Sequence, residues 1–468
     1  MGFVLSILYF ATSYLTPGVV FGPLAQYRVE LILAALIFFV SLPKLSRSFI
    51  SKTPQSIALP GLAIAVLLSV LVAERWAGGA VQAMQRFIPM AYGYFLVCLH
   101  CNTKRKLQVV VLMLLFVCLF VIAHGGFDLL HGVGTGPVQA GWNDRVDAWN
   151  GTQWSMEHPY IFFAGSESGL SWLFRLKGLG MIGDPNDFGQ LIVCEIPLVF
   201  IFWRPKRILL NIAFVLLPVS ALLLGVYLTH SRGALLALIA MAVVFGQRRI
   251  GTVPSLLLAG GLFAGAMALN FTGGRQISAA SGIDRTDLWG AGLQLLKSHP
   301  FFGVGLGSMA DYAGLTAHNS LVVCAAELGL VGLYFWCLFL FPTIRDALAV
   351  SSPAKLSEGQ QIIPEDGLFP ATTTKVEVIV KAEVNRLGRL VVLSLTGFLV
   401  AGWFLSRAFV MTFFLLGGLV EVVYELALQR GMIAPRMRLG RVLPYAGVFA
   451  ISLILLMYVM LLILNRFH

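Results

Sequence analysis

The chain has 468 residues, of which 58% are hydrophobic and 12% are charged, and its mean hydropathy is +0.84. An ordinary soluble chain is about 25% charged, and a soluble domain of this length could not bury so much apolar surface. The composition therefore excludes a soluble globular protein. The formal net charge of +11 raises nucleic-acid binding as an alternative, but the distribution of that charge argues against it.

Membrane-length apolar runs recur along almost the whole chain. A spanning helix needs roughly 20 apolar residues, so the sequence predicts an all-α membrane protein, a polytopic bundle of about 12–13 transmembrane helices. The first run is expected to be an uncleaved helix because it lacks a basic leader and a cleavage site. The predicted spans are 3–19, 29–43, 57–74, 87–102, 107–124, 187–203, 208–228, 233–247, 253–271, 319–342, 390–405, 408–426 and 443–464.

Lys and Arg gather in the short connections between these runs. Their spacing places the clusters on one side of the membrane, which the positive-inside rule makes cytoplasmic. The basic charge is therefore interpreted as a topology signal. The clusters are "KLSRSFISK" at 44–52, "TKRK" at 103–106, "RPKR" at 204–207, "QRR" at 247–249 and "RGMIAPRMRLGR" at 430–441.

Two long loops are predicted on the extracytoplasmic side, the second of them partly helical. Both are rich in glycine and aromatic residues, and long ordered loops usually carry function. The predicted organisation is N-terminal transmembrane helices in 1–124, a first extracytoplasmic loop in 125–186, transmembrane helices in 187–271, a large extracytoplasmic loop in 272–318, a transmembrane helix in 319–342, a cytoplasmic insert in 343–389 and C-terminal transmembrane helices in 390–468.

The insert and the cysteines offer no site. The insert at 350–388, which holds the alternating stretch "TKVEVIVKAEV", is expected to form a small hairpin or to stay mobile. All six cysteines fall in apolar runs, and "CLHC" at 98–101 lacks a second ligand pair, so packing is the favoured reading. Neither a metal nor another cofactor is expected.

Arg232 lies between two apolar runs in "YLTHSRGALLALIAMAVVF". An unpaired arginine at the bilayer centre would cost at least ~2.5–3.5 kcal/mol, so it is expected where one span ends and the next begins. One reading is a tight turn with a snorkelling arginine. The other is a fixed cation for an anionic headgroup, because the guanidinium fork matches phosphate oxygens and stays charged.

The stretch "RLKGLGMIGDPNDFGQLIV" leads into another predicted span. Asp184 precedes a proline and is predicted to cap that helix. The cap does not account for the upstream cations Arg175 and Lys177. Nor does it account for Asn186 and Asp187, which could orient neighbours by hydrogen bonding.

Arg285 begins the amphipathic stretch "RTDLWGAGLQLLKSHP", which predicts a helix along the membrane surface. Taken alone, this arginine reads as a solvated charge. His318 precedes the run "NSLVVCAAELGLVGLYFW". One reading is that Asn319 or Ser320 caps the helix and leaves the histidine a bystander. Glu327, inside that run, is predicted to turn inward to a polar partner.

The predicted topology places four of these residues on one side of the membrane: Arg175, Arg232, Arg285 and His318. Three cations and one ring that titrates near neutral pH suit a diphosphate and a proton transfer. Each charge-assisted hydrogen bond to such an anion contributes ~1.5–3 kcal/mol. This convergence favours a functional reading over four separate structural ones.

Several motifs in the same region resemble the O-antigen ligase and O-antigen polymerase superfamily. They are "SRGALLAL", "DRTDLWGAGLQLLKSHPFFGVGLGSM" and "AHNSLVVCAAELGLVGL", with "RLKGLGMIGDPNDFGQ" similar to an upstream motif. Members are multi-pass glycosyltransferases of the bacterial inner (plasma) membrane. They use undecaprenyl-diphosphate-linked glycans, with the active site facing the periplasm.

The resemblance implies a role for each candidate residue. Arg232 and Arg285 would hold the donor diphosphate, and His318 would take the proton of the acceptor hydroxyl in one inverting, metal-independent displacement. The remaining expected contributors are Arg175 and Lys177 at the diphosphate and Asp184, Asn186 and Asn319 in support.

The expected partners are the lipid-linked donor, a lipid or glycan acceptor and the bilayer, with no nucleic acid. Ligase, repeat-unit polymerase and protein glycosylation stay open, because the same residues would serve all three. A transporter of an anion or glycolipid is the alternative from a different class, since cations around a cavity would also serve transport. A structural membrane scaffold is a further alternative.

Overall fold

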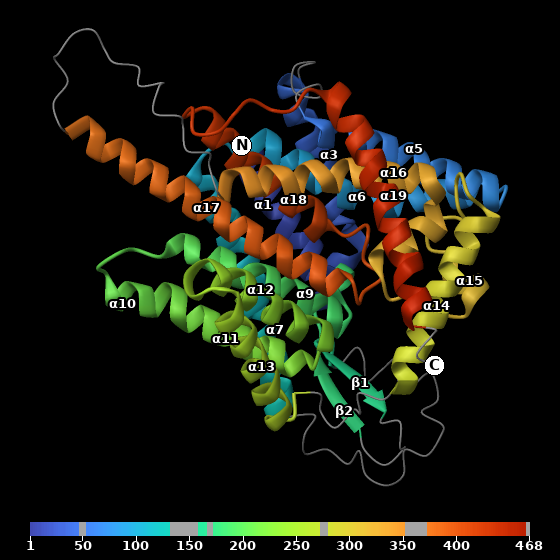
Figure 1. Ribbon diagram of the computed structural model, residues 1–468, viewed down its shortest axis with the longest axis horizontal. Coiled ribbons are helices and arrows are strands. Elements are labelled where there is room, and N and C mark those ends of the chain that lie inside the picture. The colour runs from blue at the N-terminus through green and yellow to red at the C-terminus, as the bar shows by residue number, and fades with distance from the viewer. Residues whose placement is uncertain (46–52, 132–157, 166–171, 272–278, 352–371, 465–468) are drawn as a thin grey trace.

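The computed structural model describes residues 1–45, 53–131, 158–165, 172–271, 279–351 and 372–464, and this part of the chain is almost entirely helical (Figure 1). Parts of both predicted loops and of the insert lie outside the described residues. The longer helices are α1 (Gly2–Leu15), α3 (Val29–Ser41), α5 (Pro54–Ala73), α6 (Ala77–His100), α7 (Lys104–His131), α9 (Pro185–Val199), α11 (Leu217–Thr229), α12 (Arg232–Ile250), α13 (Thr252–Ala268), α14 (Ala279–Ser298), α16 (Ser320–Ser351), α17 (Thr372–Gly402), α18 (Met411–Leu428) and α19 (Leu439–Leu464).

Short elements complete the described structure. Strands β1 (Ile161–Gly165) and β2 (Trp172–Leu176) pair antiparallel, with Ile161 opposite Leu176. The short helical segments are α2 (Pro17–Val20), α10 (Ile208–Asn211), α15 (Met309–Ala313), a π-helical turn at Ile212–Leu216, and 3₁₀ turns at Gly22–Tyr27, Leu42–Lys44, Gly180–Ile182 and Phe200–Phe202.

Among the described residues, 8 helices are long and apolar enough to cross a membrane, and three shorter helices are also apolar. The predicted all-α, polytopic fold is thus confirmed. Every predicted span overlaps a helix, but the ends differ. Helix α6 begins at Ala77, not at 87, and α16 continues to Ser351, beyond 342. Backbone hydrogen bonding carries these helices past the apolar residues that mark a span.

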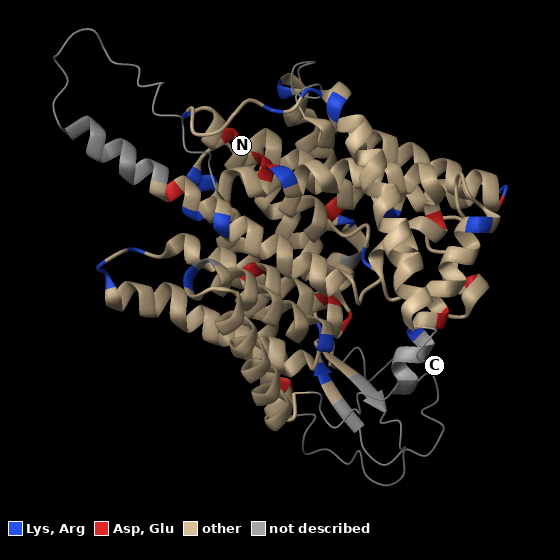
Figure 2. Ribbon diagram, in the orientation of Figure 1, with Lys and Arg blue, Asp and Glu red and all other residues tan. Residues whose placement is uncertain are grey.

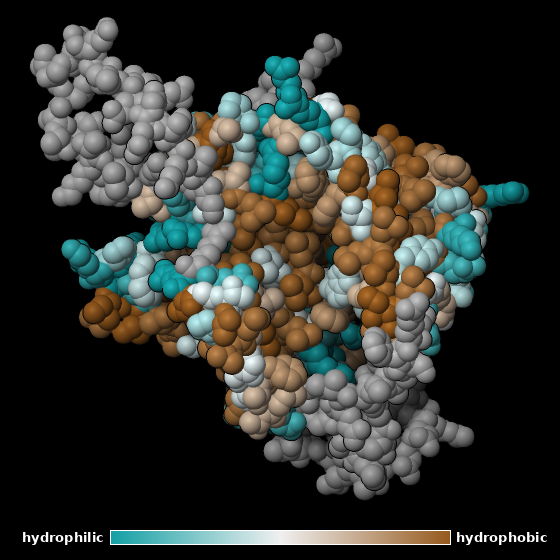
Figure 3. Space-filling view, in the orientation of Figure 1, coloured by the Kyte–Doolittle hydropathy of each residue, from teal (hydrophilic) through white to brown (hydrophobic). Residues whose placement is uncertain are grey.

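The interior of the bundle is formed by α9, α16, α17 and α18, which are mostly buried, whereas α11 and α19 lie at the periphery. Large apolar side chains remain exposed on the peripheral helices, and Figure 3 shows broad brown surfaces over the bundle. Such surfaces suit contact with acyl chains, which are as apolar as leucine.

The two ends of the bundle differ in their elements. Strands β1 and β2 lie at one end, at the bottom of Figure 1, and we call it the hairpin end. The connection between α18 and α19 lies at the opposite end, where Figure 2 shows basic residues along it.

Helix α16 is interrupted at Gly329, which has a backbone conformation (φ 63°, ψ −164°) outside the helical region. The carbonyls of Pro300 and Phe301 accept from the N–H groups of Leu330 and Val331 at 2.7 and 3.1 Å. A break within a spanning helix would otherwise leave backbone groups unsatisfied in lipid. A Cβ at Gly329 would lie 2.5 Å from the Phe301 carbonyl, so the close approach requires glycine.

The chain segment that follows Pro300 and Phe301 also surrounds Glu327. The Glu327 carboxylate accepts hydrogen bonds from the backbone of Gly307 and Met309. Glu327 is buried, so the predicted inward-facing carboxylate with a polar partner is confirmed. The alternating residues 374–384 of the insert do not form part of a hairpin, because they belong to the first part of α17. Lys, Glu and Ala are good helix formers, and the long apolar helix that follows extends backwards through them. Residues 352–371 of the insert lie outside the described residues.

Candidate functional site

Several elements meet at the hairpin end. They are β2, the start of α9, the junction of α11 with α12, the described side chains of α14, the start of α16, and the loop at 403–410 between α17 and α18, which we call the α17–α18 loop. These elements are far apart in sequence, so tertiary packing alone brings their polar side chains together.

The junction of α11 with α12 fixes the position of Arg232. Helix α11 ends at Thr229, and His230 has a left-handed backbone (φ 47°) that turns the chain. The Ser231 hydroxyl then accepts from the Ala234 N–H at 3.3 Å and caps α12. The predicted tight turn is confirmed. It leaves the anion-binding reading open, because Arg232 is the first residue of α12, where the helix dipole also favours an anion.

Arg175 links three elements through its hydrogen bonds. Its Nε donates to the Thr229 carbonyl at 2.8 Å, and its Nη2 donates to Asn186 Oδ1 at 2.9 Å. Only 4% of the residue is exposed. These contacts favour a positioning role for Arg175, which joins β2 to the end of α11 and the start of α9, over the expected diphosphate contact. Asn186 shares that role.

Asp184 caps α9, as predicted, by accepting a hydrogen bond from the Asn186 N–H at 2.7 Å. Lys177 is close enough for their charges to interact. Burial lowers the pKa of the Lys177 amine, and the Asp184 carboxylate opposes that shift. Figure 2 shows basic and acidic residues together where β2 meets α9. Lys177 thus brings a half-buried cation to the hairpin end.

Arg285 projects from α14 over the ring of Phe404 in the α17–α18 loop, with 5.9 Å between the guanidinium carbon and the ring centroid. Burial lowers the pKa of Arg285, and the positive charge of Arg232 lowers it further. Arg285 has no ion-pair partner in the described part of the chain. Two guanidinium groups that repel each other at a partly buried site would be stabilised by a bound anion.

His318 lies two residues before the first residue of α16 and has a left-handed backbone (φ 48°). Burial lowers the pKa of its ring, the positive charges of Arg285 and Arg407 act in the same direction, and Asp184 opposes them. The ring is therefore neutral at neutral pH and has a lone pair that can accept a proton. The charges that act on this pKa also show that His318 lies near both arginines.

Asn319 caps α16, as predicted, because its Oδ1 accepts from the N–H groups of Leu321 and Val322 at 3.0 and 3.1 Å. Its Nδ2 is buried and donates to no acceptor among the residues that the structure describes. The cap fixes the start of α16. The cap accounts for Asn319 alone, and the His318 ring beside it lies near the positive charges of Arg285 and Arg407.

The α17–α18 loop holds the start of α16 in place. The His318 N–H donates to the Ser406 hydroxyl at 2.9 Å, and the Ser320 hydroxyl donates to the Leu405 carbonyl at 2.7 Å. The Arg407 N–H in turn donates to the Ser320 hydroxyl at 3.1 Å. The backbone at His318 is thus set by a loop that follows it by more than eighty residues.

The sequence reasoning missed Arg407. Its Nε donates to Asp187 Oδ1 at 2.6 Å, and its Nη2 lies 2.5 Å from Oδ2, an electrostatic contact without hydrogen-bond alignment. Asp187 is buried, whereas 40% of the Arg407 side chain is exposed. A signal was present, because "SR" separates two apolar runs at 406–407 just as it does at 231–232.

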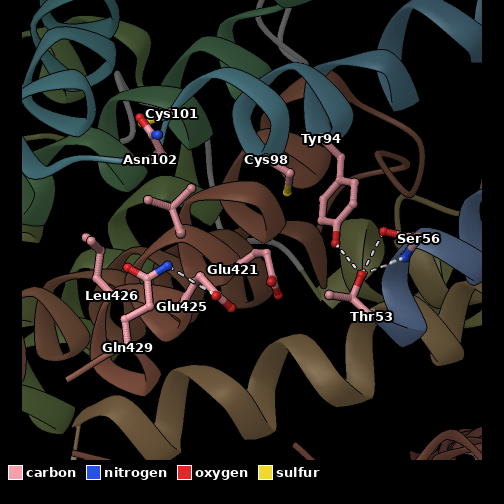
Figure 4. A pocket seen from close by; sticks show the side chains of 11 residues that line it. Thr53, Ser56, Tyr94, Cys98, Cys101, Asn102, Glu421, Glu425, Leu426 and Gln429 are labelled. Carbon is pink, nitrogen blue, oxygen red and sulfur yellow. Dashed lines mark hydrogen bonds between the residues drawn. The ribbon is translucent and has the colours of Figure 1, made fainter. Parts of the chain in front are cut away.

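A pocket of about 160 Å³ lies away from these residues, lined by side chains from α6, α18 and the start of α5 (Figure 4). Glu421 and Glu425 of α18 line it together with Cys98 and Tyr94 of α6. All six cysteines are free. Within the described residues, no group of three or more His, Cys, Asp or Glu is arranged to hold a metal ion.

Residues 217–337 match the family model described as O-antigen ligase. The match confirms the resemblance inferred from the sequence. It covers Arg232, Arg285 and His318, and it leaves Arg175, Lys177 and the α17–α18 loop outside. No curated protein sequence matches the chain.

Proposed function

We propose that this multi-pass membrane protein, which carries an O-antigen ligase-family segment at 217–337, is a glycosyltransferase. It transfers a glycan from an undecaprenyl-diphosphate donor to an acceptor hydroxyl. One observation carries the proposal: the family segment contains two guanidinium groups and a neutral imidazole that interact electrostatically at one end of the bundle.

The arginines suit the donor. The positive charges of Arg232 and Arg285 repel each other. A diphosphate bound between them would offset that repulsion. Each charge-assisted hydrogen bond contributes ~1.5–3 kcal/mol, and the contribution rises where water is excluded. The charge that develops on the leaving diphosphate would be stabilised by fixed cations without a metal. Lys177, whose charge interacts with that of Asp184, adds a further cation at this end.

His318 suits the acceptor. As the acceptor oxygen bonds to the anomeric carbon, the hydroxyl proton passes to the ring and the diphosphate leaves with the electron pair of the broken bond. A neutral ring is required, and burial together with Arg285 and Arg407 holds the pKa of His318 below its usual value. A single displacement inverts the anomeric configuration. Departure of the anionic diphosphate leaves the proton on the ring for release to water.

The reaction is assigned to the periplasmic face of the bacterial inner membrane. The basic connection between α18 and α19 lies at the end opposite to the hairpin end, and the positive-inside rule makes a basic end cytoplasmic. The lipid part of the donor stays in the bilayer and holds the diphosphate next to the site. The rate of transfer therefore depends on positioning as much as on proton transfer.

Purified protein incubated with a lipid-diphosphate oligosaccharide and acceptor tests the proposal. Undecaprenyl diphosphate should be released, His318→Ala should abolish the release, and Arg285→Ala should lower it strongly. Matched controls are His299→Ala and Lys297→Ala, two exposed residues at the end of α14, which should retain it. A protein that moves the lipid across vesicles without cleaving it would refute the enzyme and establish the transporter.

Repeat-unit polymerisation is the second candidate, because the same site would accept a growing glycan. A deletion strain separates the two. Accumulation of full-length lipid-linked glycan identifies the ligase, whereas loss of chain length identifies the polymerase.

A further inference from the structure

A cleft of about 640 Å³ opens where the later part of α16, the end of α18 and the start of α19 meet. It lies at the end of the bundle opposite to the hairpin end (Figure 1). Four arginines line it: Arg345, Arg436, Arg438 and Arg441. We call it the arginine cleft.

Two of these arginines are held by carboxylates. Arg436 forms an ion pair with Glu421 through both Nη atoms, and its guanidinium carbon lies 4.6 Å from the centroid of the Tyr424 ring. Arg345 donates from its Nε to Asp346 Oδ1 at 2.8 Å. These pairs fix the wall of the cleft.

The other two arginines bring charge that no carboxylate neutralises. Arg438 and Arg441 are exposed, and neither has an ion-pair partner in the ranges that the structure describes. The positive-inside rule accounts for basic residues at this end. It does not account for a fixed concave wall with two free guanidinium groups at its mouth.

An apolar stripe leads away from the cleft along α19. Arg441, Tyr445, Val448, Ser452 and Leu455 follow one another at intervals of four and three residues, so they lie on one face of the helix. Tyr445, Val448 and Leu455 are 53%, 61% and 58% exposed. Figure 3 shows the brown surface of this peripheral helix. A cationic cleft thus continues into a lipid-facing apolar surface.

We propose that the arginine cleft binds the phosphate headgroup of an anionic phospholipid whose acyl chains lie along the exposed face of α19. Phosphate diesters match the guanidinium fork. Basic pockets between transmembrane helices at the cytoplasmic side suit anionic headgroups. A soluble phosphate would use the arginines but not the stripe, so continuity of the two surfaces favours the lipid.

Lipid binding to the purified full-length protein in detergent tests this inference. The probes are phosphatidylglycerol, zwitterionic phosphatidylcholine and inorganic phosphate, each titrated while lipid-bound species are counted by native mass spectrometry. Phosphatidylglycerol should bind, and phosphatidylcholine should not. The double variant Arg438→Ala/Arg441→Ala should bind it about 25-fold more weakly, because each basic residue near an anionic headgroup adds about fivefold.

The matched control is Arg204→Ala/Arg207→Ala, which removes two exposed charges from the connection between α9 and α10. It should bind phosphatidylglycerol like the wild type. Equal weakening in both double variants, unchanged binding without Arg438 and Arg441, or competition by millimolar inorganic phosphate would each overturn the proposal. A photoreactive phosphatidylglycerol should label α19 in the wild-type protein, which gives a readout independent of the variants. Labelling elsewhere would also overturn it.

Discussion

The ion pair between Arg407 and Asp187 should be asymmetric, so that removing the cation costs more stability than removing the carboxylate. Asp187 is 5% exposed and Arg407 is 40% exposed, judged by their side chains. Arg407→Ala would leave a buried carboxylate without its partner, which costs about 3–5 kcal/mol for a fully buried pair. Because Arg407 is partly solvated, we expect the lower value, about 3 kcal/mol.

Asp187→Asn should cost only about 1 kcal/mol, because the amide fills the same space and the freed guanidinium can turn toward water. The double variant should lose less than the sum of the two, with a coupling energy of about 1–2 kcal/mol.

The assay is the free energy of unfolding of the detergent-purified variants, taken from urea or dodecyl sulfate denaturation curves. Arg389→Ala is the matched control, since it removes an exposed arginine of α17 and should change stability by less than about 0.5 kcal/mol. Equal losses in the two single variants, or strict additivity in the double variant, would show that the pair does not hold the α17–α18 loop to α9.

Four further outcomes are expected. Burial and nearby cations hold the pKa of His318 below its usual value. In the pH profile of kcat/KM, the fall in activity on the acid side should therefore occur at a lower pH than for an ordinary histidine. Arg285→Ala should move that fall to higher pH in the residual activity, and a move to lower pH would contradict the assignment of the base. Arg232→Lys should lower the initial rate of transfer roughly 10- to 100-fold, because a point charge cannot replace the bidentate fork; full activity would show that charge alone suffices. Asn319→Ala should cost about 1 kcal/mol in urea denaturation through loss of the α16 cap, whereas Asn319→Asp should keep the cap. EDTA should leave transfer unchanged, and inhibition reversed by magnesium would reveal a metal requirement.

Local pattern was sufficient for much of the architecture. The apolar runs predicted helices that the structure contains, because spanning a bilayer imposes a length and a composition that any window of sequence displays. The caps at Asp184 and Asn319 were predictable for the same reason, since a side chain that bonds the next turn needs no distant partner.

Other features depended on contacts that no window displays. Arg175 reads as a free cation in the sequence, yet it is buried against Thr229 and Asn186. Residues 374–384 alternate like a strand, yet they continue a long helix. In both cases, contacts with the neighbouring structure determine the conformation, and the local sequence pattern does not.

The sequence alone determined that this chain is a polytopic helical membrane protein and which of its polar residues fall between spans, because hydrophobic length and helix capping are local properties. Only the tertiary structure decided which of those residues meet. The contact of Arg407 with Asp187 joins positions 220 residues apart, and the bond from His318 to Ser406 joins positions 88 apart. Such pairings are selected by the packing of whole helices, which places two helix ends at the same depth in the bundle.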